Sequence, residues 1–481
     1  MLDLRPVGYV IGLLVAVLGA TMLIPMGIDL VVGSPDWIVF LQSAVITMLV
    51  GGSVALATSN GVGQGLTIQQ TFILTTGVWV ALPLFGALPF VLGDVDARGV
   101  DAFFEAMSGL TTTGATVLSG LDTLPEGLLF WRGLLQWFGG IGIIVVAMVF
   151  LPELRIGGMQ IFRSEGFDTF GKILPRATEI SSRISVIYFS LTVVCAVVYY
   201  ALGMSAFDAA THAMTTIATG GYANYDSSFG AFGAGPEYAA VAFMLLAALP
   251  FVRYVQLVAG TARPLLNDPQ VRVFFGTAVV LVLLLSSWQF LFDAIEEEVF
   301  RKVLFNVTSI LTGTGYASTD YMHWGSFPVV MFFFIGLIGG CAGSTACSIK
   351  IFRYQLLFAS IKAQIQSIHS PHGVFTPRYA GRRVGEDVLS SVMGFFVLFV
   401  VSLGLISVLL GMTGLDFITS VSGAAAALAN IGPGLGSEIG PAGNYAGLND
   451  TAKWILIAAM LIGRLELLVV YVLFTLKFWR G

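Results

Sequence analysis

The chain has 481 residues, of which 56% are hydrophobic and 11% are charged, and its formal net charge is −5. Soluble domains carry charge on roughly a quarter of their residues, and a chain of this length needs a large polar surface to stay in solution. The composition therefore excludes the soluble globular classes and favours a lipid bilayer as the solvent.

Ten apolar runs follow along the chain, each near the roughly 20 residues that an α-helix needs to cross a bilayer. They cover residues 7–26, 37–57, 68–92, 128–151, 184–202, 238–260, 271–291, 327–347, 388–411 and 454–476. Arg5 before the first run is typical of a signal peptide, but no polar secreted domain follows, so we expect an uncleaved helix. The pattern predicts an all-α polytopic membrane protein.

The distribution of Lys and Arg predicts the orientation. If the N-terminus is cytoplasmic and the spans alternate, most basic residues fall on the cytoplasmic side, as the positive-inside rule requires. One such loop contains Arg155, Arg163, Lys172, Arg176 and Arg183. The outer side receives Arg98, Arg132, Arg301, Lys302 and Lys453, together with most of the acidic residues. An acidic outer face would concentrate cations by long-range attraction.

Four semi-apolar segments lie between spans on the outer side, too short to cross the bilayer and too apolar for ordinary loops. They cover residues 101–115, 208–221, 300–316 and 416–433. Each has a helix-compatible stretch, then a small or polar group, then a glycine: Gly114, Gly220, Gly315 or Gly432. Three begin with Asp (Asp101, Asp208 and Asp416), a favoured N-cap whose charge also suits the helix dipole.

The repeating unit is therefore span, short re-entrant helix, glycine-ended strand, span. We expect two additional N-terminal helices in residues 1–66, and repeats at residues 67–180, 181–268, 269–384 and 385–481. A single Thr-Gly end would be an ordinary turn, and glycine in a membrane helix more often serves close packing. Four such ends at the same place in the repeat favour a common function.

Non-helical backbone at membrane depth must be buried in protein or line a watery cavity, because lipid cannot pair its N–H and C=O groups. Four short strands around an axis can direct carbonyl oxygens inward and replace the hydration shell of an ion. Glycine permits the dihedrals that such a strand needs, and the negative C-terminal ends of the re-entrant helices favour a cation. The sequence thus predicts four pseudo-symmetric repeats around a central cation pore.

The motifs SGLTTTGAT (108–116), TTIATGGY (215–222), ANIGPGLG (429–436) and GRLE (463–466) resemble the membrane subunit of the Trk/Ktr/HKT potassium-transporter superfamily. The two additional N-terminal helices are similar to the TrkH type, and the resemblance spans essentially the whole chain. It implies potassium uptake by a homodimer in the inner membrane of a prokaryote. It also implies a cytosolic regulatory subunit that binds NAD or ATP. This chain would bind no cofactor or nucleic acid; membrane lipid would surround it, and K⁺ would be its permeant ion.

The resemblance assigns a selectivity filter to three residues in each repeat, with K⁺ contacting the two residues before each glycine. They are Thr112, Thr113 and Gly114; Ala218, Thr219 and Gly220; Gly313, Thr314 and Gly315; and Asn430, Ile431 and Gly432. Relatives that admit sodium often have serine at the first glycine, so four glycines favour potassium. The family more often has a hydroxyl residue where this chain has Gly313, which would loosen the ion site there.

The eighth apolar run is interrupted by glycines whose spacing is also typical of helix packing. The resemblance instead places a gating loop here, beneath the filter, formed by Gly339, Gly340, Gly343, Ser344 and Thr345. Arg464 falls within the last run, where a charge is costly and marks a pathway. Glu466, two residues away, cannot face it on a helix. The resemblance directs Arg464 into the pore as an electrostatic barrier.

Other functional classes would show different sequence features. A membrane enzyme would need a motif such as HExxH or GxSxG, which the sequence lacks, so we expect no enzyme. A secondary transporter with broken helices would show inverted repeats and paired intramembrane carboxylates. A Na⁺-permeable or cation-coupled (K⁺/Na⁺ or K⁺/H⁺) transporter of the same fold stays the alternative.

Two further groups of residues complete the predictions. Cys195, Cys341 and Cys347 fit no metal or disulfide spacing, so we expect small apolar residues within helices. Arg378, Arg382 and Arg383 add to the basic cytoplasmic loop, where the resemblance places the regulatory subunit. Attraction to anionic lipid is the simpler explanation of this charge.

Overall fold

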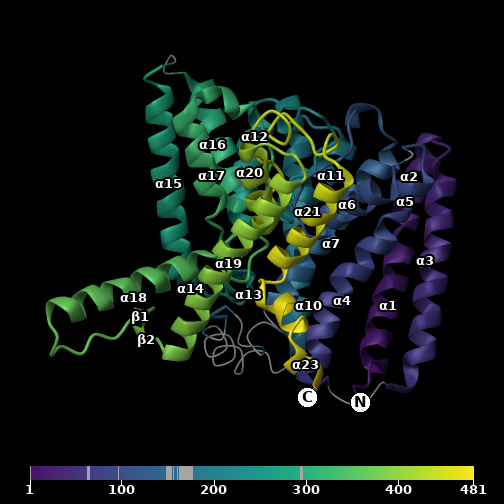
Figure 1. The fold of residues 1–481 in the computed structure, drawn as a ribbon. Coiled ribbons are helices and arrows are strands. Elements are labelled where there is room, and N and C mark those ends of the chain that lie inside the picture. Colours follow the sequence, from purple (N-terminus) through teal and green to yellow (C-terminus); the bar gives the residue numbers. More distant parts are fainter. Residues whose placement is uncertain are drawn as a thin grey trace.

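The computed structural model describes residues 2–61, 66–95, 97–147, 154, 157–159, 161, 177–292 and 296–480. The described residues are mostly helical (Figure 1). The N-terminal helices are α1 (Arg5–Thr21) and α2 (Leu23–Val32), which together make one apolar span, and α3 (Trp37–Thr58), which makes the second. Repeat 1 contains α4 (Ile68–Gly86), α5 (Leu88–Leu92), α6 (Gly99–Leu110) and α7 (Glu126–Val145). Repeat 2 contains α10 (Ala177–Ala201), α11 (Ala206–Ile217), α12 (Ala234–Ala247), α13 (Phe251–Val258) and α14 (Arg263–Leu266).

The second half of the chain continues the same order. Repeat 3 contains α15 (Pro269–Gln289), α16 (Glu297–Thr312), α17 (Ser326–Gly336) and α18 (Ile351–His369). Strands β1 (Arg378–Tyr379) and β2 (Arg382–Arg383) pair antiparallel beyond α18, with Arg378 opposite Arg383. Repeat 4 contains α19 (Glu386–Met412), α20 (Phe417–Ala429), α21 (Asp450–Arg464), α22 (Leu468–Leu473) and α23 (Leu476–Arg480).

All four re-entrant segments contain the expected short helix, namely α6, α11, α16 and α20, and most of their residues are buried. Asp416 caps α20 as predicted, since its carboxylate accepts from the backbone N–H groups of Ile418 and Thr419 at 3.1 and 3.3 Å. The prediction is wrong for Asp101 and Asp208, because α6 and α11 begin earlier and both carboxylates lie in the first turn. A negative charge there still suits the helix dipole.

Ten uninterrupted spans is an overestimate. In the described part of the chain, seven helices are long and apolar enough to cross a membrane, and α12 with α13 makes an eighth if that pair, bent by 91°, is one span. The run 327–347 is helical only as far as Gly336, and the run 454–476 breaks after Arg464. Hydropathy does not register these breaks, because the broken segments are as apolar as helices.

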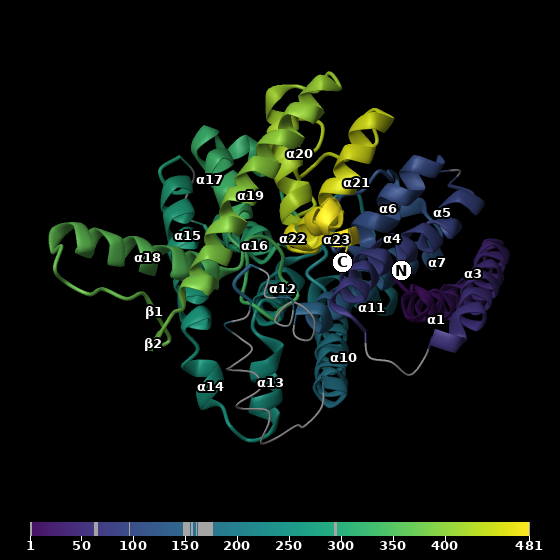
Figure 2. The same cartoon turned by 60° about the horizontal axis from the view of Figure 1, so that its bottom comes forward.

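Both termini lie at the end of the molecule where α18 and the β-hairpin project sideways, away from the bundle (Figures 1 and 2). The short helices α6, α11, α16 and α20 lie toward the opposite end (Figure 1). The basic residues Arg155, Arg163, Lys172 and Arg176 lie outside the described residues.

Candidate functional site

Each of the four short helices ends in the same backbone turn. Just past the helix, one residue has a positive φ: Thr112 (51°), Thr219 (50°), Gly313 (75°) and Asn430 (51°). The next N–H then donates to a carbonyl of the preceding helix at 2.9 Å, from Thr113, Gly220, Thr314 and Ile431. Left-handed backbone is unfavourable for threonine, which is β-branched. Its recurrence indicates that the surrounding structure imposes this conformation, as it often does at functional sites.

This shared turn determines which glycines are equivalent. Thr113, Gly220, Thr314 and Ile431 occupy one position, and the next residue is Gly114, Gly221, Gly315 or Gly432. Gly114, Gly221 and Gly315 all have φ between 80° and 85°. The prediction that Gly220 is the counterpart of Gly114 is therefore wrong by one residue. We call residues 112–114, 219–221, 313–315 and 430–432 the filter segments and number them 1 to 4 in chain order.

The filter segments close a ring in chain order. A Cβ at Gly114 would lie 2.1 Å from the Gly220 oxygen, and one at Gly221 would lie 1.9 Å from the Thr314 oxygen. A Cβ at Gly315 would lie 2.9 Å from the Gly432 nitrogen, and one at Gly432 would lie 2.7 Å from the Gly114 oxygen. Each glycine thus faces backbone of the next repeat, and the fourth faces the first. The four segments surround one axis and leave no room for side chains at these positions.

Many threonine hydroxyls that could act as ion ligands are instead hydrogen-bonded to protein. The hydroxyls of Thr111 and Thr113 lie 2.8 Å apart, as do those of Thr312 and Thr314. The Asn430 side chain donates to the Thr113 hydroxyl at 3.0 Å and so joins repeat 4 to repeat 1. These contacts brace the ring from behind and leave the backbone carbonyls as the natural ion ligands.

A cavity of about 210 Å³ opens above the ring. Its lining includes the four equivalent glycines Gly114, Gly221, Gly315 and Gly432, which independently supports the corrected register. Asp226 and Tyr225 also line it. Burial, then the Asp208 carboxylate, raises the pKa of Tyr225 to about 12, so its hydroxyl stays protonated and donates to Asp208 at 3.0 Å. The cavity therefore adjoins all four filter segments.

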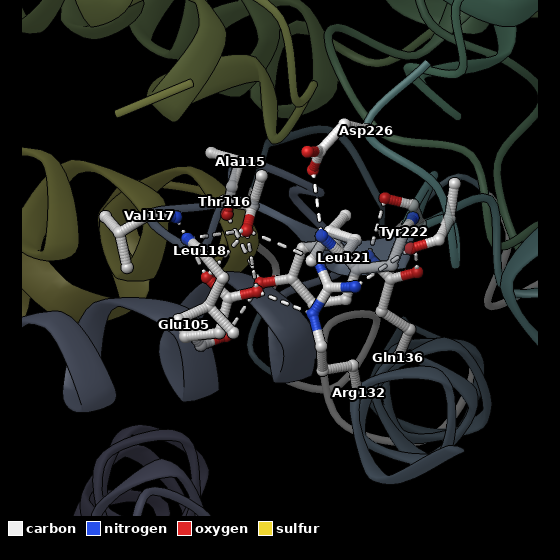
Figure 3. Close-up of polar contacts among 12 residues, drawn as sticks. Glu105, Ala115, Thr116, Val117, Leu118, Leu121, Arg132, Gln136, Tyr222 and Asp226 are labelled. Atoms are coloured by element: carbon white, nitrogen blue, oxygen red, sulfur yellow. Dashed lines mark hydrogen bonds and ion pairs between the residues drawn. The ribbon is translucent and has the colours of Figure 1, made fainter. Parts of the chain in front are cut away.

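A buried ion pair stands behind segments 1 and 2 (Figure 3). Arg132 on α7 donates to Glu105 on α6 at 2.8 Å, and both side chains are almost fully buried. Arg132 also donates to the Ala223 oxygen at 2.9 Å, while Glu105 accepts from Thr116 and from the Val117 N–H, each at 3.0 Å. The pair therefore connects the backbone that follows filter segment 1 with the backbone that follows filter segment 2. Removing one partner of such a pair typically costs about 3–5 kcal/mol.

An intramembrane loop, residues 337–350, lies against the other side of the ring. Cys347 Sγ is 3.5 Å from the Thr112 hydroxyl, and a Cβ at Gly313 would lie 3.0 Å from the Cys347 Cβ. The Ser348 N–H donates to the Ala429 oxygen at 2.9 Å. The loop thus contacts filter ends of repeats 1, 3 and 4.

The same loop fills the break in repeat 2. The Phe251 N–H donates to the Gly343 oxygen and the Cys341 N–H donates to the Ala248 oxygen, both at 3.0 Å. The Thr345 hydroxyl donates to the Ala247 oxygen at 3.1 Å. These bonds pair backbone groups that the bend between α12 and α13 leaves without helical partners, and the loop contacts all four repeats.

The five predicted loop residues Gly339, Gly340, Gly343, Ser344 and Thr345 are all buried in this loop. The predicted set stops short of Cys347 and Ser348, which lie nearest the filter. Cys341 and Cys347 are loop residues, so the expectation that they lie in helices is wrong for both; Cys195 lies in α10.

Arg464, at the end of α21, reaches the loop directly. Its guanidinium donates to Cys347 Sγ at 3.1 Å and to the Gly139 oxygen of α7 at 3.0 Å. Its Nε has no hydrogen-bond partner among the described residues, and the side chain is 4% exposed. Arg464 therefore lies one side chain away from the filter and joins repeat 4 to repeat 1 and to the loop.

Glu466 does not pair with Arg464, as expected, although the helix on which that argument relied ends at Arg464. Its carboxylate instead forms an ion pair with Arg353 of α18. Arg353 also donates to the Gly157 oxygen at 2.9 Å. This pair connects the first turn after the loop with the break in the last span.

Comparison with known proteins identifies the family of this chain. The sequence profile of TrkH, described as "Cation transport protein", matches residues 38–480. The chain belongs to the TrkH family. It is 41% identical over 477 residues to the "Trk system potassium uptake protein TrkI" of Halomonas elongata, covering 99% of this chain and 97% of the relative. It is 36% identical to the "Trk system potassium uptake protein TrkH" of Salmonella typhimurium, covering 99% of each.

The fold is similar to a solved structure. The crystal structure of the potassium transporter TrkH from Vibrio parahaemolyticus matches with a TM-score of 0.90 and 33% identity, covering 100% of both chains. The predicted fold class is therefore confirmed: an all-α polytopic membrane protein with two additional N-terminal helices and four pseudo-symmetric repeats around a central axis.

Sequence reasoning missed Gly221, Cys347 and the residues behind the filter, namely Glu105, Arg132 and Gln136. The Gly220–Gly221 pair was a visible sign that two registers were possible. The count of basic residues places Arg132 on the outer side although it falls within the apolar run 128–151, whereas it lies in α7 and is 1% exposed.

The corrected register predicts unequal effects of two neighbouring substitutions. Gly221→Ala puts a methyl group against the Thr314 backbone, at a residue whose φ is 80°. The backbone of residue 221 and that of Thr314 cannot move apart without opening the ring. Gly220→Ala meets the end of the Gln136 side chain and no backbone of the ring. Cation flux per folded protein in liposomes should fall further in Gly221→Ala. Equal losses, or a larger loss in Gly220→Ala, would contradict this register.

Proposed function

We propose that this chain mediates potassium uptake across the cell membrane through the four filter segments. The observation that carries the proposal is the closed ring of backbone, in which equivalent glycines of all four repeats meet beneath one cavity. Rings of backbone carbonyls select cations by replacing their hydration shell. Potassium is proposed because relatives that cover the whole chain are named potassium uptake proteins and all four equivalent positions hold glycine.

We further propose that the intramembrane loop is the gate and that the structure corresponds to a closed pore. The loop contacts all four repeats, and Cys347 lies directly against the filter. Arg464 adds a positive charge at the same level, donating to that cysteine. A cation leaving the filter would meet both obstacles. Glycine-rich backbone suits such a gate because few side chains must be repacked when it moves.

The orientation and partners are also proposals. Most Lys and Arg residues fall on the side of the termini when the N-terminus is placed in the cytoplasm of a prokaryote. A homodimer and a cytosolic nucleotide-binding (NAD or ATP) subunit follow from the resemblance. Arg378, Arg382 and Arg383 are exposed on the projecting hairpin and offer that subunit a basic surface.

The proposed function predicts selective flux. Purified protein in liposomes should carry K⁺ and Rb⁺ faster than Na⁺ and Li⁺. Gly114→Ser should lower the K⁺/Na⁺ ratio, since its Cβ would lie 2.1 Å from the Gly220 oxygen. Equal K⁺ and Na⁺ flux in the wild type would favour a Na⁺-permeable transporter instead. Flux that requires a Na⁺ or H⁺ gradient would favour coupled transport.

Neutralising Arg464 should raise K⁺ flux. Two unit charges 4 Å apart at an effective dielectric of 20 interact by about 4 kcal/mol. Pore water should screen most of this repulsion, and the part that remains corresponds to about a tenfold effect on rate. Arg464→Ala and Arg464→Gln should therefore conduct several-fold faster with unchanged K⁺/Na⁺ preference, while Arg464→Lys should change little. Flux is measured per folded protein, and a value at or below wild type in Arg464→Ala defeats the barrier claim.

The docking proposal concerns the hairpin. Arg382→Glu with Arg383→Glu should abolish co-purification of the cytosolic subunit, because two favourable charges become repulsive. Lys302→Glu, on α16 near the opposite end, is the control and should leave co-purification intact. Persistent binding in the double variant would place the contact elsewhere.

A further inference from the structure

One filter segment is held by a side-chain amide. Gln136 of α7 is fully buried beside segment 2 (Figure 3). Its Nε2 donates to the Gly220 oxygen at 2.7 Å, and its Oε1 accepts from the Tyr222 N–H at 3.0 Å. These two backbone groups flank Gly221. The amide therefore holds both sides of the filter glycine, much as a neighbouring strand would.

The two hydrogen bonds of the Gln136 amide join different repeats. Gln136 belongs to repeat 1, whereas residues 220–222 belong to repeat 2. Tyr222 also contacts repeat 1, since its hydroxyl donates to the backbone oxygen of Glu105 at 2.8 Å and its ring centroid lies 4.2 Å from the Arg132 guanidinium carbon. Segment 2 is thus fixed to repeat 1 by the Gln136 amide, by the hydroxyl of Tyr222 and by the contact of its ring with the buried ion pair.

Pseudo-symmetry identifies what stands in this place in another repeat. A Cβ at Gly139 of α7 would lie 1.8 Å from the Leu110 oxygen, and one at Gly463 of α21 would lie 2.1 Å from the Leu428 oxygen. Leu110 and Leu428 each lie two residues before the left-handed residue of their segment, so the two glycines are equivalent. The residue three positions earlier is Gln136 in repeat 1 and Met460 in repeat 4.

Methionine therefore fits this position in the fold. Met460 is fully buried, and it matches glutamine closely in length while offering only a weakly accepting sulfur. The space does not demand a polar group. The polar amide of Gln136 in repeat 1 is then explained by the two backbone groups to which it is hydrogen-bonded.

Holding these groups has a direct consequence for ion binding. The number and orientation of carbonyl oxygens around the axis determine which cation is bound. The Gly220 carbonyl is occupied by the amide, and without that bond it would be free to reorient together with the adjoining peptide of Gly221. A segment with several carbonyl orientations loses its preference among cations of different size.

We propose that Gln136 is a positioning residue that sets the K⁺ preference of the filter by fixing residues 220–222. This inference rests on the proposed function, because it assumes that the filter segments select the ion.

The test replaces Gln136 with the residue found at the equivalent place. Gln136→Met removes both hydrogen bonds, and it should lower the K⁺/Na⁺ flux ratio in liposomes at least about fivefold, the effect of a single bond of ordinary net strength. Met460→Leu changes the equivalent position without altering a side-chain hydrogen bond to the filter, and it should leave the ratio unchanged. Thermal unfolding of each purified variant checks that the compared proteins are folded.

The outcomes separate the two claims. A wild-type protein without K⁺ preference would remove the proposed function. A selective wild type with an equally selective Gln136→Met variant would remove only the role of Gln136, even if total flux fell. If Gln136→Met is not recovered folded, Gln136→Asn replaces it: the amide is retained but is one methylene too short to reach both groups, and an unchanged ratio there overturns the inference equally.

Discussion

Lipid cannot hydrogen-bond to a peptide group, so every non-helical backbone segment at membrane depth must find partners within the protein. The filter segments satisfy this requirement through their own turns, in which the N–H after the left-handed residue returns to the preceding helix. The intramembrane loop satisfies it by pairing with the break between α12 and α13. The loop and the break are therefore one structural feature. Moving the loop away from the ring would expose carbonyl and amide groups of repeat 2, which ties the proposed gate to the bend.

The four repeats share a backbone and differ in what they add to it. Repeat 1 supplies Gln136 and the ion pair behind the filter, repeat 3 supplies the loop, and repeat 4 supplies Arg464. The equivalence of Gly139 and Gly463 makes the last difference explicit, because the residue after each is Gly140 in repeat 1 and Arg464 in repeat 4. A fourfold ring of glycines can bind an ion on its axis, while the elements proposed to control passage occur once each.

Hydropathy and repeat patterning predict the helices and the place of the filter because both depend on local composition. They fail where a tertiary contact determines the local structure. The pair Gly220–Gly221 leaves the register open by one residue, and only the turn at Thr219 and the contact with Thr314 decide it. Pro250, which lacks an N–H, was the available sign of a break in the run 238–260. Cys347 has no signature in the sequence, since its role comes from its position between Thr112 and Arg464.

The two proposed barriers of the gate are physically coupled. Arg464 has a buried guanidinium whose hydrogen bonds go to Cys347 of the loop and to Gly139 of α7. Its Nε already lacks a partner among the described residues. If the loop withdraws, the guanidinium loses one of two acceptors while it stays near the axis, and a buried charge with fewer partners is costly. Opening of the loop therefore favours either hydration of Arg464 or its rotation away from the axis, and both weaken the electrostatic barrier. Loop movement and loss of the barrier would then occur together, because the thiol of Cys347 is common to both.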